Sequence, residues 1–457
     1  MSVTRMWAYF SKKDFVIALI VACFFTISLP GQVAFDGLLY QMSARSIFTS
    51  QFEDYYNFQR EPGYPIFLKL TLKIGFETDL IYVFAQSFLL FLGIILLSKL
   101  NWEILTFGTK KFPEKLNLVM FVLILLNPQA TIWLNFLTKQ ALISIFLVFC
   151  QIHISGIFLQ LRLGQVAPKG ALSLLKVFIT SIAIGVIGYS ISLAPALGYI
   201  FSLGLAFFLG FFVLCWHRLG DRPNALRFRP ILLRMFLRML GGSLGVTGSR
   251  HLWESYANSR GPGWSLFQHI EGRVGSTIFN FKSSPKAYIY SAVDSFRSLI
   301  GFGDRANGDG AYGQEARRFA NHAFFHGREC GSIVEYENSW FEGLLDPDYA
   351  YWIRPVCKPE LFVSIHRYFL PLSEITHSGT ILAGVIGALV VIAVRRQMLE
   401  ASMMVVSYGF IGVYAISQVL SLDRYGVPLF FLSVAFVVPY VTHVAKNYLG
   451  KPKRLFA

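Results

Sequence analysis

Apolar residues in this chain gather in long runs that are separated by short polar segments. A helix needs roughly 20 apolar residues to cross the hydrocarbon core of a bilayer. About ten runs meet this requirement. They predict membrane-spanning helices at residues 14–30, 80–98, 112–131, 137–161, 171–191, 194–215, 230–247, 376–394, 401–420 and 427–445. Asn127, Pro128 and a few further residues are all that separate the third run from the fourth, so a re-entrant arrangement is the alternative there.

The overall composition agrees with this pattern. Of the 457 residues, 54% are apolar and 16% are aromatic, which is too hydrophobic for a soluble chain of this length. The sequence therefore predicts an all-α polytopic membrane protein with about ten transmembrane helices.

Basic residues fall in clusters at every second junction between predicted spans. Loops on the cytoplasmic side of a membrane are enriched in Lys and Arg. The clusters therefore predict that both termini are cytoplasmic and that loops 31–79 and 248–375 face the outside. The basic clusters consist of Arg5, Lys12, Lys13, Lys99, Lys110, Lys111, Lys115, Arg162, Lys169, Arg218, Arg222, Arg227, Arg229, Arg395, Arg396, Lys446, Lys451, Lys453 and Arg454.

The net charge of +15 belongs to the membrane part of the chain. Residues 248–375 hold 13 Lys and Arg against 14 Asp and Glu, whereas the remaining residues hold 28 against 12. Basic residues beside apolar spans indicate membrane topology and contact with anionic lipids. We therefore expect membrane lipids as partners and no nucleic acid.

Three parts follow from this pattern: an N-terminal membrane module at 1–247, an outer domain at 248–375, and C-terminal helices with a basic tail at 376–457. The outer domain is rich in polar, aromatic and glycine residues. Helices are predicted near 284–300 and 312–326, with irregular structure between them. Cys330 and Cys357 lie in this domain, where an oxidising compartment would allow a disulfide between them; two unpaired thiols are the alternative.

The first outer loop, 31–79, concentrates polar and aromatic residues beside the membrane. Asp36, Tyr40 and Ala44 recur at intervals of four, which places them on one face of a helix. The predicted helix at 36–50 suits a membrane interface. A Pro-Gly-Tyr-Pro turn at 62–65 then leads into a second predicted interfacial helix at 65–76.

These residues carry a resemblance to a known family. A D-x3-Y-x3-A segment followed by R-x-P-G-Y-P and an apolar helix resembles the integral-membrane glycosyltransferases of the GT-C superfamily. The nearest in pattern are the protein mannosyltransferase, aminoarabinose transferase and rhizobial lipopolysaccharide glycosyltransferase group. The likeness covers residues 14–160 well and the end of the chain in part.

The resemblance implies roles for individual residues. Asp36 would be the catalytic base, with Arg60, Tyr64 and Tyr40 shaping the substrate site. Lys139 follows Thr138 near the place where family members often carry an acidic residue, so it would lie near a lipid phosphate; a lysine reaching the outer headgroups is the alternative. The R-Y-x2-P segment that begins at Arg424 and Tyr425 resembles one that many members place near the donor phosphate; an ion pair of Arg424 with Asp423 is the alternative.

The implied reaction is sugar transfer with inversion. The donor would be a sugar on a polyprenyl phosphate, and the acceptor an envelope glycan, a glycolipid or a protein. Asp36 would deprotonate the acceptor hydroxyl, and cationic residues would stabilise the leaving phosphate. The non-catalytic role open to Asp36 is a helix N-cap.

The family also implies a location and leaves one cofactor open. Many members carry a second acidic residue beside the first, but Gly37 follows Asp36 here. No cofactor is therefore certain, and a divalent cation stays open. The implied location is a bacterial inner membrane with the active site on the periplasmic face. The chain carries no Gly-rich nucleotide-binding motif, which fits a lipid-linked donor.

Three other function classes are open. A membrane acyltransferase fits least, because no convincing His and Asp pair lies within the predicted spans. An O-antigen polymerase or ligase would act on a polyprenyl-diphosphate glycan and would use basic residues of the second outer region: Arg250, His251, Arg260 and His269. A lipid or glycan transporter, or flippase, would be non-enzymatic. It would show internal repeats and broken helices at the middle of the membrane, and the sequence shows no repeat.

Overall fold

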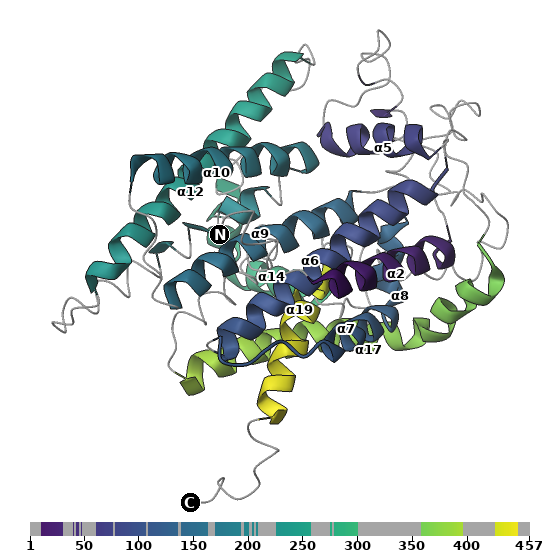
Figure 1. Cartoon of the computed structure of the whole chain (residues 1–457). Coiled ribbons are helices and arrows are strands. Elements are labelled where there is room, and N and C mark those ends of the chain that lie inside the picture. Colours follow the sequence, from purple (N-terminus) through teal and green to yellow (C-terminus); the bar gives the residue numbers. More distant parts are fainter. Residues whose placement is uncertain are drawn as a thin grey trace, which may run out of the picture.

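The structure is a computed structural model of the chain, and its long helices lie side by side in a bundle (Figure 1). It describes residues 11–30, 61–75, 78–106, 108–135, 139–162, 170–192, 196–200, 225–256, 278–299, 358–395 and 426–446, together with positions 40, 43, 44, 47, 203, 204, 207, 208, 275 and 276.

The elements of regular structure are helices, as the apolar runs predict. In chain order they are α2 (Lys12–Ser28), α5 (Gly63–Ile74), α6 (Leu80–Thr106), α7 (Lys115–Leu125), α8 (Pro128–Thr131), the 3₁₀ helix η1 (Ile132–Leu134), α9 (Gln140–Arg162), α10 (Ala171–Ile191), α12 (Ala225–Tyr256), α14 (Pro285–Leu299), α17 (Glu360–Arg395) and α19 (Val427–Val444).

Three of these helices are long and apolar enough to cross a membrane: α6, α10 and α19. Two bent pairs bring the number in the described part of the chain to as many as five. The chain is therefore an all-α protein with membrane-spanning helices. The described residues hold fewer qualifying helices than the ten that the sequence predicts, and residues 401–420 lie outside them.

The predicted interruption at Asn127 and Pro128 is present as a sharp break. Residues Lys115–Leu125 and Pro128–Leu134 meet at 84°. Asn127 caps the second piece, because its Oδ1 accepts a hydrogen bond from the Ala130 amide at 3.0 Å. Pro128 starts that piece, where its missing N–H costs nothing. The break leads the chain toward α9 with its polar groups satisfied.

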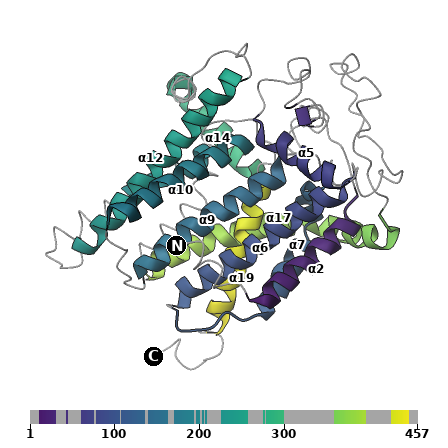
Figure 2. The same ribbon diagram turned by 45° about the horizontal axis from the view of Figure 1, so that its top comes forward.

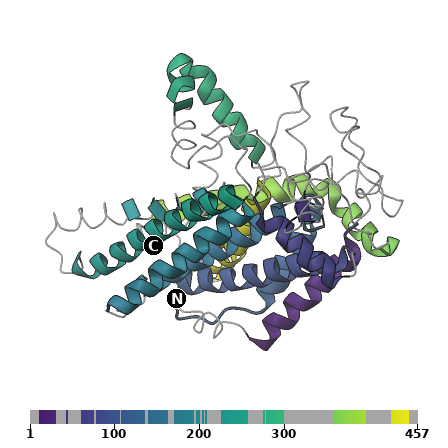
Figure 3. The ribbon, with the colours of Figure 1, turned by 90° about the horizontal axis from the view of Figure 1, so that it is seen from above.

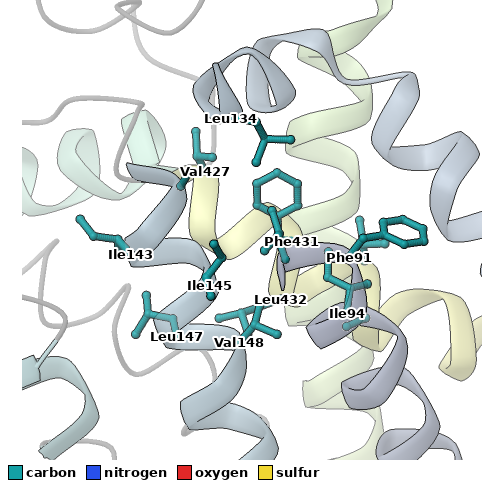
Figure 4. Packing of buried hydrophobic residues seen from close by; sticks show 14 of the residues in the cluster. Phe91, Ile94, Leu134, Ile143, Ile145, Leu147, Val148, Val427, Phe431 and Leu432 are labelled. Atoms are coloured by element: carbon teal, nitrogen blue, oxygen red, sulfur yellow. The ribbon is translucent and has the colours of Figure 1, made fainter. Parts of the chain in front are cut away.

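Helices α6, α9 and α19 enclose the main apolar core (Figure 4). Phe91 and Ile94 of α6, Ile145 and Val148 of α9, and Phe431 of α19 point into it. α6 and α19 run in the same direction. Ser98 Oγ donates to the Ala435 carbonyl at 3.2 Å, and further along the helices Trp102 packs against His443.

Helices α10 and α12 pack parallel and unusually close, as Figure 2 shows. A Cβ built on Gly185 would lie 2.3 Å from the Gly242 carbonyl oxygen, and one on Gly245 would lie 2.3 Å from the Ile182 carbonyl oxygen. These contacts leave room for hydrogen alone. The glycines of 241–245 are therefore what lets the two backbones meet.

The described residues between α10 and α12 run the opposite way. Ile200 lies against Gly242, Met239 against Gly204, and Phe207 against Phe236. As the residue number rises from 200 to 207, the contacted residue on α12 moves back from 242 to 236, so this segment runs antiparallel to α12. This direction is the one expected for the predicted span 194–215.

Helix α17 joins the predicted second outer region to the bundle. It begins at Glu360, well before the predicted span at 376, and it bends by 57° between Glu360–Ser373 and Ile375–Gly387. Pro371 lies just before the bend and removes a backbone hydrogen bond. Helix α12 likewise continues through the predicted domain boundary at 247.

The two ends of the bundle differ in what covers them. At one end, called here the α5 end, α5 packs against α6 and α10. The opposite end, called the Lys99 end, holds an ion pair between Lys99 of α6 and Asp14 of α2, and Asn117 Nδ2 donates to Asp14 Oδ1 at 3.3 Å.

Helix α14 projects from the bundle in Figure 3 and confirms the helix predicted near 284–300.

Candidate functional site

Helix α5 covers the α5 end of the bundle because one glycine lets it approach. A Cβ built on Gly63 would lie 2.5 Å from the Ser190 carbonyl oxygen, at the end of α10. The R-E-P-G-Y-P segment therefore docks on α10 through its glycine. The helix predicted at 65–76 is present and starts two residues earlier, at Gly63.

Tyr40 and Tyr64 bring the two sequence segments of the first loop together. Their ring centroids lie 4.8 Å apart, with the rings nearly perpendicular. Ala44 is fully buried, and Tyr40 is 1% exposed. Both lie on the helix face that the intervals of four predict. The D-x3-Y-x3-A and P-G-Y-P segments are thus in direct contact.

Tyr64 is completely buried, and its Oη makes no hydrogen bond within the described part of the chain. Burial raises the pKa of this phenol well above its ordinary value, and the nearby Tyr40 adds to the effect. Tyr64 therefore keeps its proton and is able to donate a hydrogen bond to a ligand.

Lys139 pairs with Glu61, the acidic residue of the R-E-P-G-Y-P segment. Lys139 Nζ lies 2.7 Å from Glu61 Oε2, and the two side chains are 16% and 14% exposed. The pair links the first loop to the start of α9. Lys139 thus lies next to the predicted site, with a protein carboxylate as one partner. Glu61 lies inside the R-E-P-G-Y-P segment, but the sequence alone indicates no role for it.

Lys69 makes a second link within the first loop. Its Nζ donates to the Ile47 carbonyl at 2.6 Å, so the α5 helix holds the end of the preceding segment. The amine of Lys69 is thus engaged by the protein backbone. Burial lowers the pKa of Lys69, with a further effect from Lys73.

A layer of buried polar side chains lies beneath this loop. Tyr82 Oη donates to the Asn135 carbonyl at 2.7 Å, and Asn135 Nδ2 donates to the Leu29 carbonyl at 2.7 Å. Gln86 Nε2 donates to the Leu134 carbonyl at 3.0 Å. These bonds fasten the ends of α2, α6 and η1 together and give the loop a rigid floor.

A buried ion pair fixes the start of α17 to the same floor. Lys358 Nζ lies 3.0 Å from Asp79 Oδ2, and the side chains are 3% and 1% exposed. Asp79 directly precedes α6, and Lys358 precedes α17. The chain therefore leaves the predicted outer domain beside the first loop.

Several predicted site residues lie outside the described residues: Asp36, Arg60, Arg424, Tyr425, Cys330 and Cys357. Asp36 lies four residues before Tyr40 in the sequence, and Arg424 lies two residues before Gly426.

The described residues contain no group of three His, Cys, Asp or Glu side chains that could hold a metal ion. Two buried histidines of α17 lie within hydrogen-bond distance of protein side chains. His366 Nε2 lies 2.7 Å from Ser28 Oγ, and His377 Nδ1 lies 3.1 Å from Asn127 Nδ2. They link α17 to α2 and to the broken helix. Of the basic residues that a polymerase or ligase would use, Arg250 and His251 lie on α12. Arg260 and His269 are outside the described residues.

No family model, curated protein or solved structure matches this chain. The candidate site is therefore defined by its own geometry: an aromatic pair, an ion pair and an unused phenol at the α5 end. Glu61, Asp79, Asn135 and Lys358 belong to its framework and were not singled out from the sequence.

Proposed function

We propose that this protein is a GT-C-like membrane glycosyltransferase. It transfers a sugar from a polyprenyl-phosphate donor to an envelope glycan, glycolipid or protein acceptor, with inversion. Asp36 acts as the base. The active site lies at the α5 end, which faces the periplasm of a bacterial inner membrane.

The contact between Tyr40 and Tyr64 carries this proposal. It brings the Asp36 segment onto the turn that follows Arg60, although these parts are separated by some twenty residues of polar sequence. The two segments form the core of the family resemblance. Their meeting at one end of a helical bundle is what a shared active site requires.

The chemistry divides among the residues around this contact. Asp36, within reach of Tyr40, takes the proton of the acceptor hydroxyl. Tyr64 offers an unused phenol O–H to the sugar or its phosphate. Arg60, Arg424 and Tyr425 stabilise the leaving phosphate. Lys139 adds positive charge beside them and is held in place by Glu61.

Helix directions support a count of about ten spans. Helices α17 and α19 run parallel, because His377 stacks on Phe430 and Gly387 lies against Tyr440. Two consecutive parallel helices require the chain between them to return, and residues 396–425 contain the predicted span 401–420. The same reasoning applies to the parallel helices α10 and α12.

The two alternatives predict different behaviour. The break at Asn127 is a feature that transporters also use. The side chain of Asn127 is engaged by His377 and by the cap on Ala130, so it is not available to a substrate. A polymerase or ligase would instead depend on Arg250 and His251.

The test is transfer by the purified chain. Protein in detergent or nanodiscs is given polyprenyl-phosphate sugars and an extract of envelope glycolipids, and labelled product is separated by chromatography. Transfer from the monophosphate donor supports the proposal. Consumption of polyprenyl-diphosphate glycans alone favours the polymerase or ligase. Movement of label across sealed vesicles without product favours the transporter.

A further inference from the structure

Helix α14 presents large apolar side chains at its surface. Ile289, Tyr290 and Val293 are 54%, 61% and 48% exposed. Within the described part of the chain, no other helix packs extensively against α14. Single exposed apolar side chains are common on proteins, but a group of them on one helix marks a surface that contacts a partner or a membrane.

These side chains share one face of the helix with two cations. Helical positions three, four and seven apart lie on the same side. Counted from Lys286, this spacing places Ile289, Tyr290, Val293 and Arg297 on one face. Lys286 and Arg297 are exposed, and Lys286 Nζ lies 5.9 Å from the centre of the Tyr290 ring. The face therefore has apolar side chains in its middle and a positive charge toward each end.

The helical segment just before α14 has the same character. Phe279 and Phe281 are 69% and 47% exposed, and Lys282 is also exposed. The ring of Phe281 packs edge-on against Tyr288 of α14, with 5.7 Å between the ring centroids. The apolar and basic surface thus extends past Pro285, where α14 begins, onto the preceding residues.

Charge sets this segment apart from the rest of the predicted outer domain. Residues 278–299 hold 3 Lys and Arg against 1 Asp, whereas the remainder of 248–375 holds 10 Lys and Arg against 13 Asp and Glu. Positive charge therefore gathers where apolar side chains are exposed. A helix that combines the two suits the headgroup region of an anionic bilayer.

The direction of α14 also suits a membrane surface. Helix α10 is long and apolar enough to span a membrane, and its last turn meets α5 through the contact of Ser190 with Gly63. Figure 3 shows α14 extending sideways from the bundle near this end of α10, at a steep angle to it. A helix that lies across the end of a spanning helix runs along the membrane plane, as interfacial helices do.

We infer that α14 lies on the membrane surface at the α5 end and binds its anionic phospholipids. Ile289, Tyr290 and Val293 enter the interface between headgroups and acyl chains. Lys282 and Lys286 contact the lipid phosphates. This contact holds the predicted outer domain on the bilayer, and it does not rest on the proposed transfer reaction.

The test measures the depth of α14 in liposomes that contain phosphatidylcholine and phosphatidylglycerol. The full chain carries one cysteine labelled with the fluorophore NBD, and the five native cysteines are replaced. Ile289→Cys and Val293→Cys place the probe on the inferred lipid face. Ser291→Cys is the control, because it is exposed on the opposite side of the same helix. Lipids with a nitroxide near the headgroup should remove most of the emission at 289 and 293, whereas aqueous iodide should quench the probe at 291.

A second arm tests the charge. With the probe at 289, Lys286→Gln should shift the ratio of lipid-bound to water-exposed helix about fivefold toward water. Lys176→Gln removes an exposed cation of α10 and should leave this ratio unchanged.

Two results would overturn the inference. One is equal quenching by iodide at 289, 291 and 293. The other is a probe at 289 that is shielded from iodide but not quenched by the nitroxide lipids, because a protein surface would then cover the face. Energy transfer between two differently labelled copies would identify that surface as a second chain.

Discussion

Lys139 and Glu61 form an ion pair across 78 residues of sequence, with 2.7 Å between Nζ and Oε2. The pair connects the Pro-Gly turn of the first loop to the start of α9. It also holds the Lys139 ammonium group next to the first-loop segment that the proposed site uses.

Exchanging these two charges tests the pair directly. Glu61→Lys or Lys139→Glu alone should cost about 1 to 3 kcal/mol, because each leaves a half-buried charge facing its like. The double exchange should recover much of the loss. Thermal unfolding of the four proteins in one detergent measures this. Equal midpoints for all four would show that the pair contributes nothing.

The ion pair of Asp79 with Lys358 should matter more, since it is almost completely buried. Asp79→Asn leaves an uncompensated ammonium group and should cost about 3 to 5 kcal/mol. Glu360→Gln is the control. It removes the ion pair between Glu360 and Arg367, in which the Glu360 side chain is 70% exposed. This change should cost less than about 1 kcal/mol. Similar losses of thermal stability in both variants would contradict this assignment.

Gly63→Ala should disturb the site without unfolding the bundle. The added methyl group would meet the Ser190 backbone at 2.5 Å, so α5 must move away from α10. We expect activity to fall by about 10-fold or more, because small displacements in an active site are costly. Gly379→Ala on α17 has open space and should keep its activity. Full activity in Gly63→Ala would remove α5 from the site.

The ten-span arrangement predicts opposite accessibility at the two ends of residues 396–425. With the five native cysteines replaced, Gln397→Cys should react with an impermeant maleimide only after cells are opened. Ser421→Cys should react in cells whose outer membrane alone is permeable. Labelling of both from the same side would contradict a span at 401–420.

Two continuous apolar segments were predicted to within one residue. The span predicted at 171–191 is α10, Ala171–Ile191, and that at 427–445 is α19, Val427–Val444. Their ends coincide with a loss of hydrophobicity, which is a local property. The break at Asn127 was also predictable, because Asn-Pro starts a new helix by local hydrogen bonding.

Polar extensions of helices were not predictable in the same way. Helix α12 runs from Ala225 to Tyr256 and α17 from Glu360, well beyond their apolar cores. Arginine and glutamate are good helix formers, so hydropathy does not mark these ends. Helix α17 also packs its polar half on α2 through His366 and Ser28, which a sequence alone does not indicate.

The site was predictable only in part, for a related reason. Intervals of four along the first loop correctly placed Tyr40 and Ala44 on a buried face. Partners distant in sequence, such as Asp79 and Lys358, depend on how helices pack, and local patterns carry no signal for them. The roles of Asp36, Arg60, Arg424 and Tyr425 remain predictions.

The most direct measurement is the rate of sugar transfer by Asp36→Asn beside wild type and Asp54→Asn. Asparagine keeps the capping ability of Asp36 but cannot take a proton, so the rate should fall by about 100-fold or more. Asp54→Asn removes another carboxylate of the same loop and should leave the rate nearly unchanged. Transfer by Asp36→Asn at the wild-type rate would contradict the proposed base and the mechanism built on it.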